Sequence, residues 1–150
     1  MQAKVCSSLT FPGHRFGVRS SAPHLVDQAI DVANALKAAK HLCVFTGAGI
    51  STSTGIPDFR GPNGVWTLKA QGKTPTSRTR MEAAIPSYTH MALKALFEHF
   101  EATGRRCYLM SGNTDGLHRK SGMAHHGLSE FHGCCNVEYC GKCSREVRLL

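Results

Sequence analysis

The spacing of apolar residues along the chain predicts alternating helices and strands. Two segments, Pro23–Lys40 and Ser87–Glu101, place apolar residues three or four positions apart, as an amphipathic helix does. Three short apolar runs predict strands, namely Leu42–Thr46, Cys107–Met110 and Leu128–Phe131. A helix between two strands implies a crossover connection, and therefore a parallel sheet. The expected fold class is α/β.

The segments between these elements are polar and rich in glycine. We expect a short helix to begin at Ile50–Thr54 and to be broken by Gly55-Ile56-Pro57. Gly61–Ile85 carries many Lys, Arg, Thr and Gly residues and predicts a mobile loop or a small insert. Residues 1–22 contain basic residues and serines but no acidic residue. This composition fits a disordered N-terminal extension, and it also resembles a weak transit peptide.

Two segments without apolar runs stand at the ends of the first two predicted strands. They are Thr46–Gly49, at the end of Leu42–Thr46, and Ser111–Asp115, after Cys107–Met110. Ligands of open α/β sheets bind at the carboxyl ends of parallel strands. The sequence therefore predicts a binding site where these two segments meet.

The first of these segments has the composition of a phosphate cradle. Gly47 and Gly49 let the backbone approach a pyrophosphate, and the start of a helix offers free N–H groups to an anion. Gly55 follows Gly49 by six residues rather than three, so the usual dehydrogenase fingerprint fails. A tight turn without a ligand is the alternative for Gly-x-Gly alone, and an ordinary Rossmann oxidoreductase is disfavoured.

Composition and charge indicate which partners and which cellular compartment suit the chain. With 18 basic and 10 acidic residues, the formal charge of +8 favours acidic partners such as nucleic acid or chromatin. The basic residues are scattered, which equally fits a solvated surface, and we expect no direct sequence-specific binding of nucleic acid. Seven cysteines without a secretory signal indicate a reducing compartment, with metal ligands or free thiols rather than disulfides. No apolar run approaches the roughly 18 residues of a membrane span.

Three ordered blocks together resemble one family. They are Gly47–Gly61, Asn113–His118, and Glu130–Gly133 followed by Cys140-Gly141-Lys142-Cys143. They resemble the signatures of the sirtuins, the NAD-dependent protein deacylases, and span about two thirds of the chain. Gly61–Leu68 and Thr89–Leu93 further resemble class IV, the chromatin-associated branch that includes human sirtuins six and seven. The implied fold is a partial Rossmann-like parallel sheet with the start of a small zinc-binding module.

The resemblance also implies roles for individual residues. Phe59 would cover the nicotinamide ribose, with Asp58 and Arg60 ordering the loop. Asn113 and Asp115 would form the nicotinamide pocket, where an amide and a carboxylate can pair with a carboxamide. A loop salt bridge around a buried phenylalanine, and a plain Asn-x-Asp-Gly turn, are the structural alternatives. The implied NAD-binding residues are Gly47, Ala48, Gly49, Ser51, Thr52, Asp58, Phe59, Arg60, Trp66, Asn113 and Asp115.

His132 is the candidate general base, because it stands in the Glu130-x-His-Gly block and imidazole titrates near neutrality. With Asn113 and Asp115 it completes the candidate catalytic set. We expect the pair His125-His126 to lie on the surface, and we assign no chemistry to His118.

Cys140 and Cys143 have the spacing of half a structural zinc site, which needs four ligands. Cys134 and Cys135 fall outside the ligand positions of the family. No second Cys pair follows, so we expect no stable zinc unless another chain completes the site. Two incidental thiols remain the alternative.

The function that the resemblance implies is NAD-dependent protein-lysine deacetylation, in which the acetyl group moves to ADP-ribose and nicotinamide leaves. The substrate would be an acetylated protein, with histones and chromatin as candidates. Two alternatives stay open: mono-ADP-ribosylation of proteins, and a catalytically inactive NAD-binding fragment, because the chain resembles a C-terminally truncated sirtuin domain over 23–150. Nuclear location follows the branch, with mitochondrial or cytoplasmic location as alternatives. Gly112 replaces the Gln that most sirtuins carry before Asn113, which removes a contact to the ribose.

Overall fold

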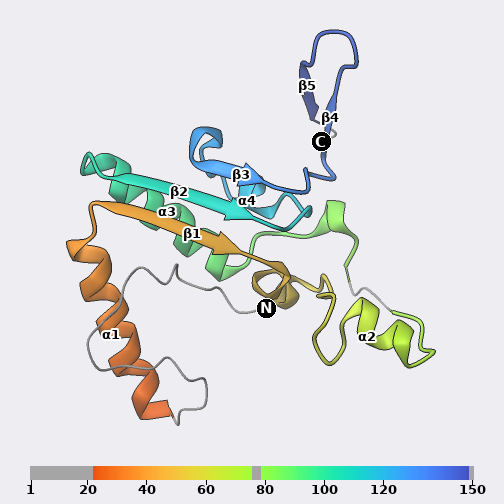
Figure 1. The fold of residues 1–150 in the computed structure, drawn as a ribbon, viewed down its shortest axis with the longest axis horizontal. Helices are drawn as coiled ribbons and strands as arrows, with labels where there is room; N and C mark the ends of the chain where they lie inside the picture. The colour runs from red at the N-terminus through yellow and green to blue at the C-terminus, as the bar shows by residue number, and fades with distance from the viewer. Residues whose placement is uncertain (1–21, 76–78, 149–150) are drawn as a thin grey trace.

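The computed structural model describes residues 22–75 and 79–148, and a parallel sheet forms its centre (Figure 1). The sheet contains β1 (His41–Thr46), β2 (Arg106–Ser111) and β3 (Leu128–Glu130), in the order β1-β2-β3. Both pairings are parallel, so the three carboxyl ends lie at the same edge. The predicted α/β class and all three predicted strands are confirmed.

A helix precedes each of the first two strands, as the apolar spacing predicted. These are α1 (Ala22–Ala38) and α3 (Tyr88–Ala102). Ser87 caps α3, because its side chain accepts the N–H of His90 while the His90 ring accepts the N–H of Ser87. The predicted disorder over 1–22 concerns residues of which 1–21 lie outside the described part.

The core lies between α3 and one face of the sheet. Phe97 of α3 packs with Leu109 of β2 and with Met123, and Leu42, Val44, Leu93, Cys107 and Leu128 surround them. In Figure 1, α3 runs behind β1 and β2. Burial of this apolar face fixes the strand register, and the register in turn sets which loops meet at the carboxyl edge.

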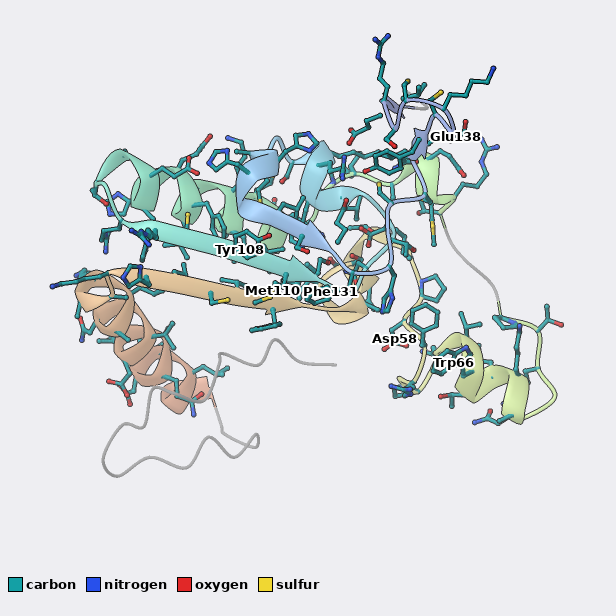
Figure 2. All side chains as sticks on the ribbon, turned by 45° about the horizontal axis from the view of Figure 1, so that its top comes forward. Asp58, Trp66, Tyr108, Met110, Phe131 and Glu138 are labelled. Atoms are coloured by element: carbon teal, nitrogen blue, oxygen red, sulfur yellow. The ribbon has the colours of Figure 1, made fainter. Side chains whose placement is uncertain are left out.

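The opposite face of the sheet carries apolar residues that stay accessible. Phe45 of β1 pairs with Met110 of β2, and Tyr108 lies one pleat away on the same face (Figure 2). The side chains of Phe45 and Tyr108 are 37% and 42% exposed. The continuous apolar runs of β1 and β2 are typical of strands covered on both faces, whereas the described residues cover one.

The chain after β1 does not form the expected short helix. It makes two separate 3-10 turns, Ala48–Ile50 and Thr52–Thr54, and Gly55 ends the second with φ of 91°. The prediction for Ile50–Thr54 was therefore wrong in type, though Gly55 is the break as expected. A single 3-10 turn supplies a few free N–H groups rather than the dipole of a helix.

The predicted mobile loop Gly61–Ile85 contains ordered structure. A short helix α2 (Val65–Ala70) and a 3-10 turn (Met81–Ala83) lie within it, while residues 76–78 are not described. The backbone N–H groups of Val65 and Trp66 donate to the carbonyl oxygens of Asp58 and Phe59, both at 2.9 Å. These bonds fold the start of α2 back onto the preceding loop, so this part is a small insert rather than an open loop.

The C-terminal part starts with α4 (Leu117–Lys120) and a 3-10 turn (His125–Gly127), and ends in the antiparallel hairpin β4 (Val137–Tyr139) and β5 (Glu146–Arg148). In Figure 1 the hairpin projects beyond the carboxyl edge of the sheet. The side chains of His125 and His126 are exposed, as predicted. Among the described residues, no helix is long and apolar enough to cross a membrane.

Candidate functional site

The carboxyl edge of the sheet brings together two loops that are about 65 positions apart, residues 47–51 and 113–117, which we call the pocket loops. The side-chain amide of Asn113 donates to the carbonyl oxygen of Gly47 at 3.0 Å. The hydroxyl of Ser51 donates to Oδ2 of Asp115 at 2.6 Å and lies 3.3 Å from the Asn113 amide nitrogen. All three side chains are buried. The predicted meeting of the two segments is therefore confirmed.

The Asp115 carboxylate is held on both oxygens. Besides the Ser51 hydroxyl on Oδ2, the N–H of Leu117 donates to Oδ1 at 2.9 Å, at the start of α4. Gly116 has φ of 69°, and a Cβ there would lie 2.8 Å from both Asn136 Nδ2 and Cys134 Sγ. Glycine is thus required at 116, and the loop presents a buried carboxylate beside a buried amide. Such a pair can accept from and donate to a carboxamide if Ser51 yields its place.

The turn after β1 offers free backbone N–H groups to an anion, although a second 3-10 turn rather than an α-helix follows it. The N–H groups of Ile50 and Ser51 close the turn by donating to Gly47 and Ala48. Among the described residues, the N–H groups of Ala48 and Gly49 have no protein acceptor. Two adjacent free donors in a glycine-rich turn fit a phosphate oxygen. Thr52 is exposed, and its hydroxyl donates to the carbonyl oxygen of Gly49 at 3.0 Å.

A third loop, Asp58–Trp66, presents aromatic rings, and we call it the ring loop. The ring centroids of Phe59 and Trp66 are 5.1 Å apart, and the Arg60 guanidinium lies 4.8 Å from the Trp66 ring centroid. The side chains of Phe59 and Trp66 are 48% and 51% exposed. Asp58 and Trp66 lie near each other, away from the sheet (Figure 2). The alternative of a buried phenylalanine is therefore wrong.

Contacts within the ring loop hold its conformation. Oδ1 of Asp58 accepts the N–H of Gly61 at 3.0 Å, whereas Arg60 stacks on Trp66. A Cβ at Gly64 would lie 2.6 Å from the backbone carbon of Phe59. Gly64 thus permits a close approach of these two backbone segments. An exposed aromatic pair that follows the glycine-rich turn along the chain can cover the sugar of a bound nucleotide.

His132 lies just beyond β3 at the same edge. The N–H of Phe131 donates to the carbonyl oxygen of Ser111 at 3.0 Å, which anchors this turn beside the end of β2. Cys135 N–H donates to the carbonyl oxygen of Thr114 at 2.8 Å and ties the following residues to a pocket loop. The His132 side chain is exposed. Its accessible imidazole near the pocket loops is a suitable place for a proton acceptor.

Two buried histidines beneath the pocket loops were missed as site residues. Nε2 of His118 lies 2.9 Å from the Thr46 hydroxyl, and the ring centroids of His90 and His118 are 4.7 Å apart. Burial lowers the pKa of His90, while Asp115 acts in the opposite direction. The pKa of His118 falls to about 4, chiefly through burial and secondarily through His90. The sequence signals were present in Ser87-x-x-His90, a capping pattern, and in the last residue of Asn113–His118.

The two cysteines of the predicted zinc knuckle lie on the exposed hairpin. Cys140 and Cys143 are exposed thiols in the turn between β4 and β5. Backbone N–H groups of Lys142 and Cys143 and the side chain of Cys143 lower the pKa of the Cys140 thiol. This is the environment of a thiolate ligand. In the described ranges, no three His, Cys, Asp or Glu side chains are grouped to hold a metal ion.

Comparison with known proteins places this arrangement in a family. The sequence model of the Sir2 family matches residues 73–149. The chain belongs to the Sir2 family. It is 46% identical over 122 residues to the NAD-dependent protein deacetylase Sirt6 of Drosophila melanogaster, covering 81% of this chain and 37% of that protein. It is 43% identical over 113 residues to the NAD-dependent protein deacetylase sirtuin-7 of Homo sapiens, covering 75% of this chain and 27% of that protein.

Solved Sir2 structures share the fold of this Sir2-family chain. One, a Sir2 variant with a deacetylated p53 peptide and 3'-O-acetyl ADP-ribose, has a TM-score of 0.58 and 26% identity over 80% of this chain and 53% of that chain. Another, Sir2 with a p53 peptide and NAD+, has a TM-score of 0.54 and 26% identity over 79% of this chain and 51% of that one. The chain thus spans about a third of the curated relatives and half of the solved structures.

Proposed function

We propose that this Sir2-family chain carries the NAD site of a protein-lysine deacetylase that moves an acetyl group from lysine to ADP-ribose and releases nicotinamide. One observation carries the proposal: Ser51, Asn113 and Asp115 converge at the carboxyl edge of the parallel sheet. Relatives that match four fifths of the chain are named NAD-dependent protein deacetylases, which supports the same reaction.

The residues at this edge suit the parts of a dinucleotide. The free N–H groups of Ala48 and Gly49 would bind the pyrophosphate, within the glycine-rich turn that also carries Gly47. Asn113 and Asp115 would hold the nicotinamide carboxamide, with Ser51 giving up its bond to Asp115. NAD supplies the electrophilic ribose carbon and the leaving nicotinamide.

The ring loop and His132 would act on either side of the ribose. Phe59 and Trp66 expose ring faces that can exclude water from the reacting centre, and Arg60 keeps Trp66 in place. His132 would accept the proton of a ribose hydroxyl, because its imidazole is accessible and follows the strand end that lies beside β2. Asp58 and Thr52 would order the loops through their bonds to backbone groups.

We also propose a zinc site, which would stabilise the fold rather than take part in the reaction. The thiols of Cys140 and Cys143 fit half of a tetrahedral site, and the lowered pKa of Cys140 favours a ligating thiolate. Two further ligands would have to come from outside the described residues. With those ligands, the hairpin would become a knuckle that stiffens the segment following His132.

We propose acetylated lysine in a protein as the substrate, with histones and chromatin as the first candidates. The formal charge of +8 supports an acidic assembly as the surrounding partner. Location in the nucleus would follow from such a partner.

The proposal is tested by measuring nicotinamide release from NAD with an acetyl-lysine peptide. Release should require the peptide and should stop in His132→Ala. The matched control is His99→Ala, which removes an exposed histidine in the last turn of α3, outside the pocket loops. Release without peptide, or undiminished release from His132→Ala, would contradict the assigned reaction.

A further inference from the structure

A chain of polar side chains that the proposed reaction does not use lies beneath the pocket loops. The Thr46 hydroxyl contacts His118, the His118 ring lies against the His90 ring, and Nδ1 of His90 lies 2.7 Å from the Ser87 hydroxyl. The Ser87 hydroxyl in turn donates to the carbonyl oxygen of Ile50 at 2.9 Å. We call these four side chains the histidine clamp. It joins β1, α4 and α3 across the fold.

The two ends of the histidine clamp enclose the cradle turn. Thr46 directly precedes Gly47, and Ile50 is the last residue of the first 3-10 turn. The N–H of Gly112 also donates to the carbonyl oxygen of Thr46 at 3.1 Å, next to Asn113. The clamp therefore holds both ends of residues 47–50, and the Asn113 amide adds a bond to the carbonyl oxygen of Gly47. The conformation of the free Ala48 and Gly49 N–H groups depends on all three attachments.

Both rings of the clamp are buried with one nitrogen unsatisfied. The His90 and His118 side chains are 0% and 2% exposed. Nε2 of His90 and Nδ1 of His118 have no hydrogen-bond partner among the described residues. A protonated ring carries a hydrogen on both nitrogens, so Nε2 of His90 and Nδ1 of His118 would each become an N–H without an acceptor. The pair is thus adapted to the neutral form, and a further proton on His118 would have no acceptor.

The groups around the two histidines do not offset the cost of burying a protonated ring. The groups facing it are Thr46 from β1, Ser87 from the start of α3 and Asp115 from the pocket loop, and only Asp115 is ionisable. Asp115 favours protonation of both rings, but burial outweighs it, and the pKa values of both histidines are lowered. A proton added in acid would place a positive charge beside the second ring, in a buried site.

We propose that His90 and His118 are positioning residues: as a neutral buried pair they hold the cradle turn in its binding conformation, and protonation of the pair releases that turn. The identity of the ligand that the turn binds rests on the proposed function, whereas the clamp itself does not. An acid-sensitive loss of cofactor would follow, with its origin beneath the site rather than in a group that contacts the ligand.

Hydrogen exchange of the full chain tests the clamp without any ligand. Protection of the Ile50 and Ser51 amides, corrected for intrinsic rates, should fall about tenfold between about pH 7.5 and about pH 4.5, while amides of β2 stay protected. His118→Gln, which keeps a polar group toward Thr46 but cannot take a proton near neutrality, should lack this fall. His99→Gln, which removes an exposed histidine of α3, should behave like the unchanged chain. An equal fall in His118→Gln would overturn the proposal.

The second measurement separates positioning from stability. Thr46→Val exchanges one hydroxyl for a methyl group, so it removes the contact to His118 with little change in volume. In folded protein at about pH 7.5 we expect it to lose the protection of the Ile50 and Ser51 amides and to weaken NAD binding about tenfold. His118→Leu should do the same, and His118→Gln should restore most of the affinity. Unchanged protection in folded Thr46→Val would overturn the clamp even if His118→Leu does not fold.

The two measurements also separate this inference from the proposed function. If the unchanged chain binds no NAD, the proposed function fails, and exchange of the Ile50 and Ser51 amides still decides the clamp. If NAD binds but Thr46→Val leaves both its affinity and the exchange unchanged, the function stands and the clamp is refuted.

Discussion

The pocket loops and the ring loop are held in opposite ways, although the first pocket loop and the ring loop both follow β1. In the pocket loops, Ser51, Asn113 and Asp115 are buried and satisfy one another. In the ring loop, Phe59 and Trp66 are half exposed and are held by backbone bonds within the loop. Buried polar groups must be mutually satisfied, so change in one pocket residue is expected to spread, whereas change in the ring loop should stay local.

The largest expected effect is at the centre of the pocket loops. Asp115→Ala removes a carboxylate that accepts from Ser51 and Leu117, and leaves both donors buried without an acceptor. We expect the free energy of unfolding to fall by about 4 kcal/mol, measured by urea denaturation. Thr52→Ala is the control, because the Thr52 hydroxyl bond is exposed. Equal stability of the Asp115 and Thr52 variants would contradict the interlocked pocket.

Acid should weaken the pocket side through the histidine clamp. The folded protein disfavours protonated His118, whose pKa is about 4, whereas the unfolded chain takes up a proton near pH 6.5. Stability should therefore be full above about pH 6.5 and should fall by about 3 kcal/mol as pH drops to about 4. Urea denaturation across this range measures it. His118→Gln should flatten this part of the profile, and an unchanged slope would refute the assignment.

A pair of glycines compares the ring loop with the pocket side directly. At Gly64 a Cβ would lie 2.6 Å from the backbone of Phe59, while at Gly112 the nearest atom would be Thr46 O at 3.9 Å. Gly64→Ala should cost about 2 kcal/mol and change the fluorescence of Trp66, the single tryptophan. Gly112→Ala should stay within about 0.5 kcal/mol. The reverse order would contradict the described packing.

The smallest expected effect concerns affinity rather than stability. The space beside Gly112 admits a side chain, and the sirtuin resemblance places a ribose-contacting glutamine there. Gly112→Gln should strengthen NAD binding by about 1 kcal/mol, roughly fivefold, measured by calorimetry. Weaker binding than in Gly112→Ala would show that the ribose does not reach this position.

The parts of the fold with a regular apolar spacing were predictable, and the polar contacts were not. The strand after His41 and the helix after Ser87 follow from spacing, and the parallel sheet follows from their order. The bond between Ser51 and Asp115 joins residues 64 positions apart, so no local pattern reports it. The family resemblance placed both residues at one site. Their roles toward NAD remain predictions.

One local prediction was wrong in the type of helix, and the prediction for Gly61–Ile85 was confirmed only in its second form, a small insert, for physical reasons. After β1, the left-handed Gly55 ends a second 3-10 turn before a helix can form. In the polar segment after Gly61, a close backbone approach that only Gly64 permits starts α2, which composition alone does not indicate. His118 was left without a role because its contacts to Thr46 and His90 come from other elements of the fold.

The central claim is that the pocket loops bind NAD through the Asp115 carboxylate. Isothermal titration calorimetry of NAD against the full chain and against Asp115→Asn tests it most directly, because the substitution keeps the shape and removes the charge. We expect measurable binding to the unchanged chain and a loss of affinity of at least about tenfold in Asp115→Asn. Equal affinities in two folded proteins would contradict the claim.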